Sequence, residues 1–194
     1  FAGTESYVYV SLDNGDHWQS ISLNLPNTSY RDMVIKNNDV VVGTFGRSFW
    51  VLDDISPLRQ LAAENAAKAS HLFKPADAIR VRRNVNDDTP FPPEMPHAIN
   101  PPNGAIIYYT LTSKPSSDIV LEIKDSKGRV IHHYSSAKPK PLGDPPPPVP
   151  DWWIAPQEQL PAEIGLNRTN WNLRYDNPNA FSRSYEINAN PGET

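Results

Sequence analysis

The sequence predicts a mainly β chain: an antiparallel meander, then one short helix, then an incomplete β-sandwich. Three observations predict this class. Short apolar or alternating runs recur between turn residues along most of the 194 residues. A single segment is rich in strong helix formers. Proline is abundant, with 21 residues, so we expect much of the chain to be loop or extended segment.

The first region, residues 1–55, has the pattern of an antiparallel meander. Its apolar runs are short and closely spaced, and turn residues such as Asn37-Asn38 separate them. Such spacing favours strands that pair with their sequence neighbours. The predicted strands are residues 7–10, 18–21, 32–36, 40–44 and 48–52.

Residues 56–70 are predicted to form a connecting helix. Ser56 can cap a helix, and Pro57 is tolerated at the first helical position. Residues 58–67 are mostly Ala, Leu, Gln and Glu, which are strong helix formers. Leu58 and Leu61 are three residues apart, so one face of this helix can pack against a core.

The last region, residues 71–194, predicts a partial sandwich with a proline-rich loop. Residues 125–128 read as a hairpin turn in which Gly128 can take a positive φ. Residues 90–102 form a proline-rich linker, and residues 138–141 and 145–148 should be extended, polyproline-like and exposed. The predicted strands are residues 79–82, 105–111, 118–124, 129–134 and 165–175.

Composition excludes several classes of function. The net charge of −4 argues against a nucleic-acid partner, which needs a concentrated basic face. The chain has no cysteine, which rules out disulfides, thiolate metal sites and cysteine nucleophiles. It has no apolar run long enough to cross a bilayer, so we expect no membrane span. The chain begins at Phe1 and ends in a turn-like run, and we expect it to be a piece of a longer protein.

The most specific motif is Ser-x-Asp-x-Gly-x-x-Trp, which is formed by Ser11, Asp13, Gly15 and Trp18. In a hairpin, Asp13 can accept backbone N–H groups of its own turn, and Ser11 can add a hydroxyl bond. Gly15 supplies a backbone conformation that a Cβ would penalise. Trp18 is expected to fold back over the hairpin and bury a large face. We therefore assign this motif a structural role and not a catalytic one.

This motif is an Asp-box, and the residues around it widen the resemblance. Residues 25–26, 31–35 and 39–54 resemble the closing blades of bacterial Asp-box (BNR) repeat proteins, which include sortilin-like and glycosyl-hydrolase-like propellers. The resemblance implies the end of a β-propeller, a helix at residues 56–61, and an immunoglobulin- or fibronectin-like sandwich. Residues 165–175 are similar to one strand of that sandwich. The family continues with a further hairpin, so here the sandwich should be incomplete.

The same resemblance implies partners and a location. The remaining propeller blades of the parent chain would be the immediate partners of residues 1–55, and the protein would be secreted or periplasmic. An open sheet in residues 1–54 would leave strand edges exposed and would favour self-association.

Arg47 and the pair Trp152-Trp153 are the candidate binding residues. Arg47 follows Gly46 between two predicted strands and could reach a carboxylate or a sugar; we favour a role in bonding loop carbonyls. The flat rings of Trp152 and Trp153 could stack on sugar rings. We favour the alternative that they cover the sandwich core and anchor the proline-rich loop.

Two pairs of adjacent residues carry titratable groups. Neighbours on a strand face opposite sides, so Asp53 and Asp54 cannot flank one glycosidic bond. We expect them to end the strand and cap the helix. His132 and His133 should diverge for the same reason, and no third ligand lies nearby in sequence. The sequence thus predicts no catalytic residue, no metal site and no cofactor.

Two classes of function stay open. In the first, the chain is a non-catalytic structural or binding module that recognises polysaccharide or protein. In the second, it belongs to a propeller glycoside hydrolase, either sialidase-like or xyloglucanase-like. The catalytic groups of such an enzyme would come from several blades, so most of them would lie outside this chain.

Overall fold

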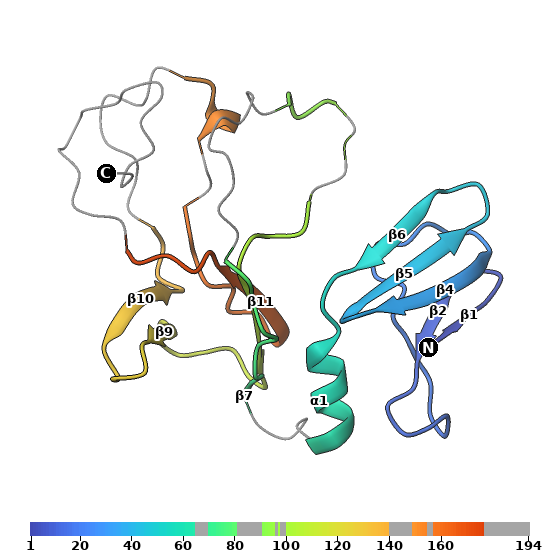
Figure 1. Cartoon of the computed structure of the whole chain (residues 1–194), viewed down its shortest axis with the longest axis horizontal. Helices are drawn as coiled ribbons and strands as arrows, with labels where there is room; N and C mark the ends of the chain where they lie inside the picture. The colour runs from blue at the N-terminus through green and yellow to red at the C-terminus, as the bar shows by residue number, and fades with distance from the viewer. Residues whose placement is uncertain are drawn as a thin grey trace.

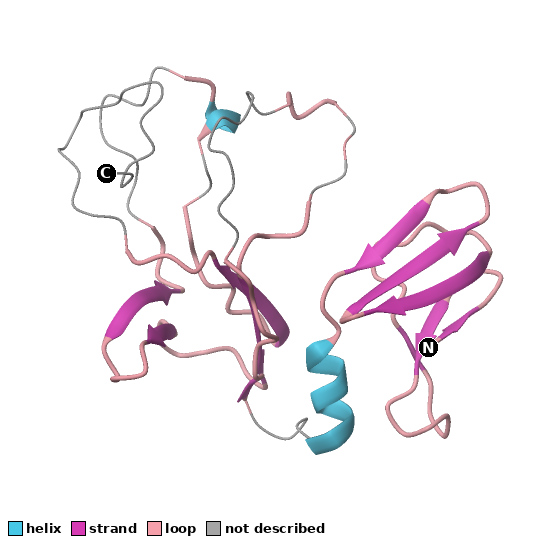
Figure 2. Cartoon of the chain, in the orientation of Figure 1, coloured by secondary structure: helices cyan, strands magenta, loops and turns pink. Residues whose placement is uncertain are grey.

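The structure, a computed structural model, describes residues 1–64, 70–80, 91–95, 97, 100–139, 149–154 and 157–176. Over these ranges the chain is mainly β, with one short α-helix and small antiparallel sheets, none of them closed. This confirms the predicted fold class. Figures 1 and 2 show two strand-rich parts, with the helix α1 between them.

The N-terminal part, residues 1–64, holds two three-stranded antiparallel sheets with the orders β1-β2-β3 and β4-β5-β6. The second sheet is a simple meander, as predicted from the spacing of its strands. The sheets meet where the Tyr30 N–H donates to the Thr4 carbonyl at 3.0 Å. The strands are β1 (Ala2–Gly3), β2 (Val8–Val10), β3 (Gln19–Ser20), β4 (Tyr30–Lys36), β5 (Asp39–Thr44) and β6 (Phe49–Leu52).

One apolar cluster holds this part together. Alternation along β5 sends Val40 and Val42 to the same face, where they pack with Val8 of β2. Tyr30 and Ile55 complete the buried cluster. Burying a side chain of this size contributes roughly 1.5–3 kcal/mol, so this face is what fixes the register of the meander.

The helix α1 (Ser56–Glu64) follows directly. The group that caps it is the carboxylate of Asp54, which accepts the Ser56 N–H at 3.1 Å; Ser56 itself is the first helical residue. Leu58 packs against the N-terminal core, as its spacing predicts. The helix is tied to the next segment by the Gln60 amide, which donates to the Lys74 carbonyl and accepts the Lys74 N–H, both at 2.9 Å. Residues 65–69 of the predicted helix lie outside the described residues.

The C-terminal part, residues 70–176, holds a three-stranded sheet of order β11-β8-β7 and a hairpin of order β10-β9. The two sheets share a core built on Tyr109, Tyr134 and Leu160. A short 3₁₀ helix, η2 (Asp151–Trp153), lies before the last strand. The strands are β7 (His71–Leu72), β8 (Ala105–Leu111), β9 (Val120–Lys124), β10 (Val130–Ser135) and β11 (Gly165–Trp171).

Some predicted bounds differ from the structure. The strand expected over residues 165–175 ends at Trp171, because Leu173 has a φ of 63°, which breaks the extended backbone. Residues 79–80 form no strand, and residues 81–82 lie outside the described residues. Gly128 does take the positive φ expected of the hairpin turn, at 78°.

Candidate functional site

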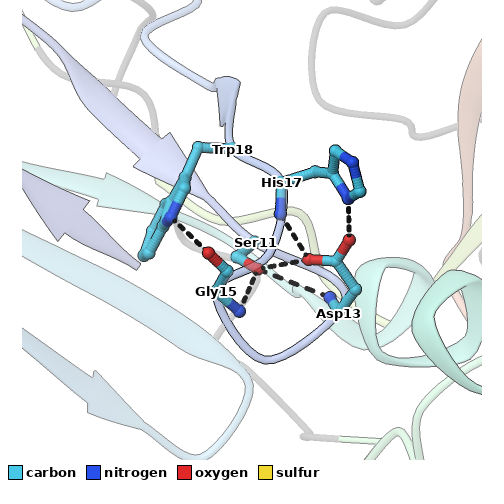
Figure 3. Close-up of polar contacts among 5 residues, drawn as sticks. All are labelled: Ser11, Asp13, Gly15, His17 and Trp18. Atoms are coloured by element: carbon cyan, nitrogen blue, oxygen red, sulfur yellow. Dashed lines mark hydrogen bonds and ion pairs between the residues drawn. The ribbon is translucent and has the colours of Figure 1, made fainter.

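The Asp-box forms a closed hydrogen-bonded turn between β2 and β3 (Figure 3). The Ser11 hydroxyl accepts the Gly15 N–H at 2.8 Å and donates to Asp13 Oδ1 at 2.9 Å. The same oxygen of Asp13 accepts the His17 N–H at 2.9 Å. Gly15 has a φ of 105°, in the region that L side chains rarely adopt. Ser11 and Asp13 therefore supply the hydrogen bonds of this turn, and Gly15 supplies its positive φ.

The carboxylate of Asp13 is also paired with the ring of His17. Oδ2 of Asp13 lies 2.5 Å from His17 Nδ1. The backbone N–H of His17, followed by its side chain, lowers the pKa of Asp13 to about 2. Both oxygens of this carboxylate are occupied inside its own turn. Such a group serves the turn and is a poor general base.

Trp18 closes the turn from the outside. Its indole N–H donates to the Gly15 carbonyl at 3.0 Å, so the ring folds back over the hairpin (Figure 3). Trp18 nevertheless stays 48% exposed, whereas the sequence led us to expect a large buried face. The ring covers the turn and not the core, because the turn projects from the sheet.

Arg47 lies in the tight loop between β5 and β6. The loop uses positive φ at Gly46 (73°) and Ser48 (66°), and the Thr44 N–H donates to the Ser48 carbonyl at 3.3 Å. The carbonyl of Arg47 accepts the Trp50 indole N–H at 2.9 Å, while its side chain is exposed. The backbone of Arg47 therefore supports the loop, and its guanidinium group faces solvent.

Asp53 and Asp54 point to different surroundings. Asp54 is buried and caps Ser56 at the start of α1. Asp53 faces the C-terminal part, where its Oδ2 lies 4.0 Å from Arg168 Nη2 and its carbonyl accepts the Tyr108 hydroxyl at 3.3 Å. These contacts make Asp53 a joint between the two parts of the chain. The geometry does not resemble two carboxyl groups on either side of a glycosidic bond.

The electrostatics of Asp53 follow from this position. Burial raises the pKa of Asp53, the Arg168 guanidinium opposes the rise, and the carboxylates of Asp39 and Asp54 add to it. The guanidinium carbon of Arg168 also lies 5.9 Å from the centre of the Tyr108 ring. Arg168 therefore serves the contact between the two parts.

Trp152 and Trp153 lie in η2, with about half of each side chain exposed. The turn is fixed by the Trp153 N–H, which donates to the Pro150 carbonyl at 2.9 Å. Their exposure is close to that of Trp18, which closes the Asp-box turn. η2 and the loop that carries Arg47 lie on different parts of the molecule, so the structure does not bring the candidate binding residues together (Figure 1).

His132 and His133 diverge on β10, as expected of strand neighbours. The side chain of His132 is only 13% exposed, while that of His133 is 63% exposed. Two carboxylates approach them: Glu158 Oε2 lies 3.3 Å from His132 Nε2, and Asp176 contacts both rings. Sequence reasoning missed Glu158 and Asp176, because both lie in irregular segments that no periodicity marks. Among the described residues, no group of three or more His, Cys, Asp or Glu side chains could hold a metal ion.

An open apolar groove of about 250 Å³ lies between β7–β8 and the start of β9. Its walls are mainly aliphatic, including Leu72, Leu111 and Leu121, and no carboxylate lines it. The titratable side chains in its lining are those of His71 and Tyr109, and the Tyr109 hydroxyl donates to the Pro161 carbonyl.

No helix among the described residues has the length and apolarity needed to cross a membrane. No protein-family model matches the chain, and no curated protein or solved structure is significantly similar to it.

Proposed function

We propose that this chain is a non-catalytic module of an Asp-box β-propeller protein, and that its β4–β5–β6 sheet packs against a neighbouring sheet of the same kind. The observation that carries the proposal is a row of apolar side chains across the face of this sheet that the apolar cluster of the N-terminal part leaves uncovered. Asp32, Lys36 and Asp39 lie on the same face, on either side of this row.

The uncovered face is defined by the strand register. Val34 of β4, Val41 of β5 and Val51 of β6 are direct cross-strand partners, so they form one row across the sheet. Val34 and Val51 are 57% and 54% exposed. Phe49, which is 77% exposed, lies beside Gly43 and extends the row. We call these residues, Val34, Val41, Phe49 and Val51, the outer apolar row.

Such a pattern is typical of a sheet with a second layer on each side. A strand with one wet face alternates apolar and polar residues, whereas a strand covered on both faces reads as a continuous apolar run. Residues 40–42 are three consecutive valines. Val40 and Val42 face the core, and Val41 faces the opposite side of the sheet. A flat row of branched side chains fits another sheet, which packs about 10 Å away, better than it fits a small ligand.

The Asp-box supports a propeller blade as the second layer. In the family that the sequence resembles, the sheets are stacked blades, so the remaining blades of the parent chain are the occupant that we propose. If the parent is a glycoside hydrolase, its catalytic groups belong to those other blades. In this chain the carboxylates of Asp13, Asp53 and Asp54 are engaged in a turn, a joint and a helix cap.

Sedimentation of the isolated chain tests the proposal, because a second copy of the same sheet is then the available partner. We expect the wild-type chain to self-associate as its concentration rises, and Val51→Lys to remain monomeric with an unchanged melting temperature. A lysine on an exposed edge strand is well tolerated.

The matched control is Val42→Lys, on the inner face of the same sheet. It should unfold the N-terminal part, because it buries an unpaired charge. The proposal is wrong if the wild-type chain stays monomeric at high concentration, or if Val51→Lys destabilises the chain as much as the control.

Polysaccharide binding at Trp152-Trp153 is a second candidate function. The observation that favours it is the exposure of two adjacent indole rings, which offer flat apolar faces for sugar rings. This class of ligand fits the secreted or periplasmic location that the family resemblance implies.

A glycan-binding screen tests this second candidate. We expect a glycan that binds the wild-type chain to lose most of its affinity for Trp152→Ala and Trp153→Ala. Trp18→Phe is the control, since Trp18 is equally exposed but lies in the Asp-box. Binding that survives both alanine substitutions, or a screen that finds no ligand, would rule out sugar recognition by Trp152 and Trp153.

A further inference from the structure

His132 lies between two carboxylates. Its side chain points into the C-terminal part, where the ring meets Tyr134 edge to face with 4.4 Å between ring centres. Nε2 faces Glu158 at 3.3 Å, and Nδ1 contacts Asp176. Each of the two ring nitrogens therefore has its own negatively charged neighbour.

This arrangement suits only one protonation state of the ring. A neutral imidazole has one N–H donor and one bare nitrogen, whereas the imidazolium ion has a donor at both positions. A bare nitrogen facing a carboxylate is repelled by it. Both nitrogens of His132 are shielded from solvent, so water does not compete with the attraction between opposite charges. The site therefore fits the charged ring.

The two carboxylates belong to different irregular segments that follow the free edge of β10. Near one end of the strand, the Leu160 N–H donates to the Ser135 carbonyl at 2.9 Å. Near the other end, the Asp176 N–H donates to the Ile131 carbonyl at 3.3 Å. Within the described ranges, β10 pairs with β9 alone, on its other side, and these two segments lie along the edge that faces away from β9. His132 lies between the two attachment points.

We propose that His132, Glu158 and Asp176 form a pH-sensitive clasp, which holds residues 157–160 and 172–176 on the edge of β10 while the imidazole is protonated and loosens when the proton is lost.

The other groups around the His132 ring do not place a charge against it that would replace the two carboxylates. His133 Nδ1 is 3.6 Å from Asp176 Oδ2, but the His133 side chain is 63% exposed, so solvent screens this contact. The Tyr134 hydroxyl donates to the Asn170 carbonyl at 3.0 Å. Burial raises the pKa of Tyr134, and Glu158 and Asp176 add to the rise, so the phenol stays neutral. On β9 the residue opposite His132 is Ile123, which carries no charge.

The sign of the pH effect follows from the charges. Histidine side chains in general lose their proton between about pH 5 and 8. Carboxyl groups in general take up protons near about pH 4. The clasp needs a charged ring and charged carboxylates together. It should be strongest in mildly acidic solution, between these two ranges, and weaken as the pH rises towards 8.

Hydrogen exchange measured by NMR tests the clasp at the bonds it protects. We expect the protection factors of the Leu160 and Asp176 amides, corrected for intrinsic exchange, to fall about tenfold from pH 5.5 to 8 in the wild-type chain. In His132→Gln both amides should be weakly protected at either pH. Glu158→Gln and Asp176→Asn should each make this pH-dependent fall in amide protection smaller. The control is His97→Gln, since the His97 ring contacts the Met95 carbonyl and the exposed Phe91 ring, away from β10, and should leave the wild-type behaviour unchanged.

A second measurement on the wild-type chain needs no variant. The ¹⁵N shifts of the His132 ring should show two protonated nitrogens at pH 5.5. A neutral ring at that pH overturns the proposal. Equal protection of both amides at the two pH values overturns it as well, and so does an undiminished pH effect in His132→Gln.

Discussion

Asp13 is fixed by the residues of its own turn. The His17 N–H and ring and the Ser11 hydroxyl all act on one carboxylate. The four residue types of the Asp-box were enough to foresee a structural aspartate and a glycine in an unusual conformation. The His17 ring contact was not foreseen, because position 17 is unspecified in the motif. The half-exposed Trp18 was not foreseen either, since the sequence does not show how far the turn projects from the sheet.

Asp13→Asn should remove a pH-dependent part of the stability. The pKa of Asp13 is lowered from 3.8 to about 2 in the folded chain, so the charged form favours the folded state above about pH 4. That contribution is lost as the pH falls from about 4 to about 2. Melting temperatures across this range should fall more steeply for the wild-type chain than for Asp13→Asn. Parallel curves would show that the carboxylate does not stabilise the turn.

At the level of elements, strand positions were easier to predict than strand ends. The runs that became β4, β5, β8 and β9 are marked by apolar and β-branched residues, and burial then fixes which face each residue shows. The end of β11 depends on the positive φ of Leu173. Leucine rarely adopts a positive φ, so the sequence does not predict this end. Glu158 and Asp176 lie in irregular segments that run along the edge of β10. Their positions depend on tertiary packing, which no local sequence pattern shows.

Gly104→Ala should weaken the contact between the start of β8 and the end of β11. A Cβ at Gly104 would lie 2.0 Å from the Trp171 carbonyl oxygen and 2.8 Å from the Asn172 Cα, and the residue has a φ of 100°. We expect a loss of about 3 kcal/mol or more in the free energy of unfolding, because backbone would have to move.

Gly128→Ala is the matched control for this prediction. Gly128 also has a positive φ, of 78°, but nothing lies within 4 Å of the added Cβ. It should cost only about 1 kcal/mol, from backbone strain alone. Equal costs in urea denaturation of the two variants would contradict the close approach of β8 and β11.

Over the residues that the structure describes, the two strand-rich parts meet through Asp53 and through Gln60 of α1. Asp53 meets Arg168 and Tyr108, and Gln60 of α1 bonds both backbone groups of Lys74. The sequence indicated the mainly β class, the single helix and the sheets, because these follow from local patterns. It did not indicate the joint at Asp53, because the partners are 55 residues apart or more and carry no mark of pairing.

The outer apolar row is the feature of the whole molecule on which the proposed function rests. It was visible in the sequence only as runs of apolar residues without alternation. The structure shows which of these residues face the core and which remain exposed. The row therefore depends on both the pattern and the register.

Thiol labelling of Val34→Cys tests the outer apolar row most directly. The chain has no native cysteine, so the introduced thiol is the sole reporter. If this face packs against another sheet, the rate of labelling should fall several-fold as the protein concentration rises and copies associate. A cysteine at Leu23, which is 77% exposed and lies outside the row, should react at a constant rate. A Val34→Cys thiol that reacts at the same rate at every concentration would contradict the proposed role of this face.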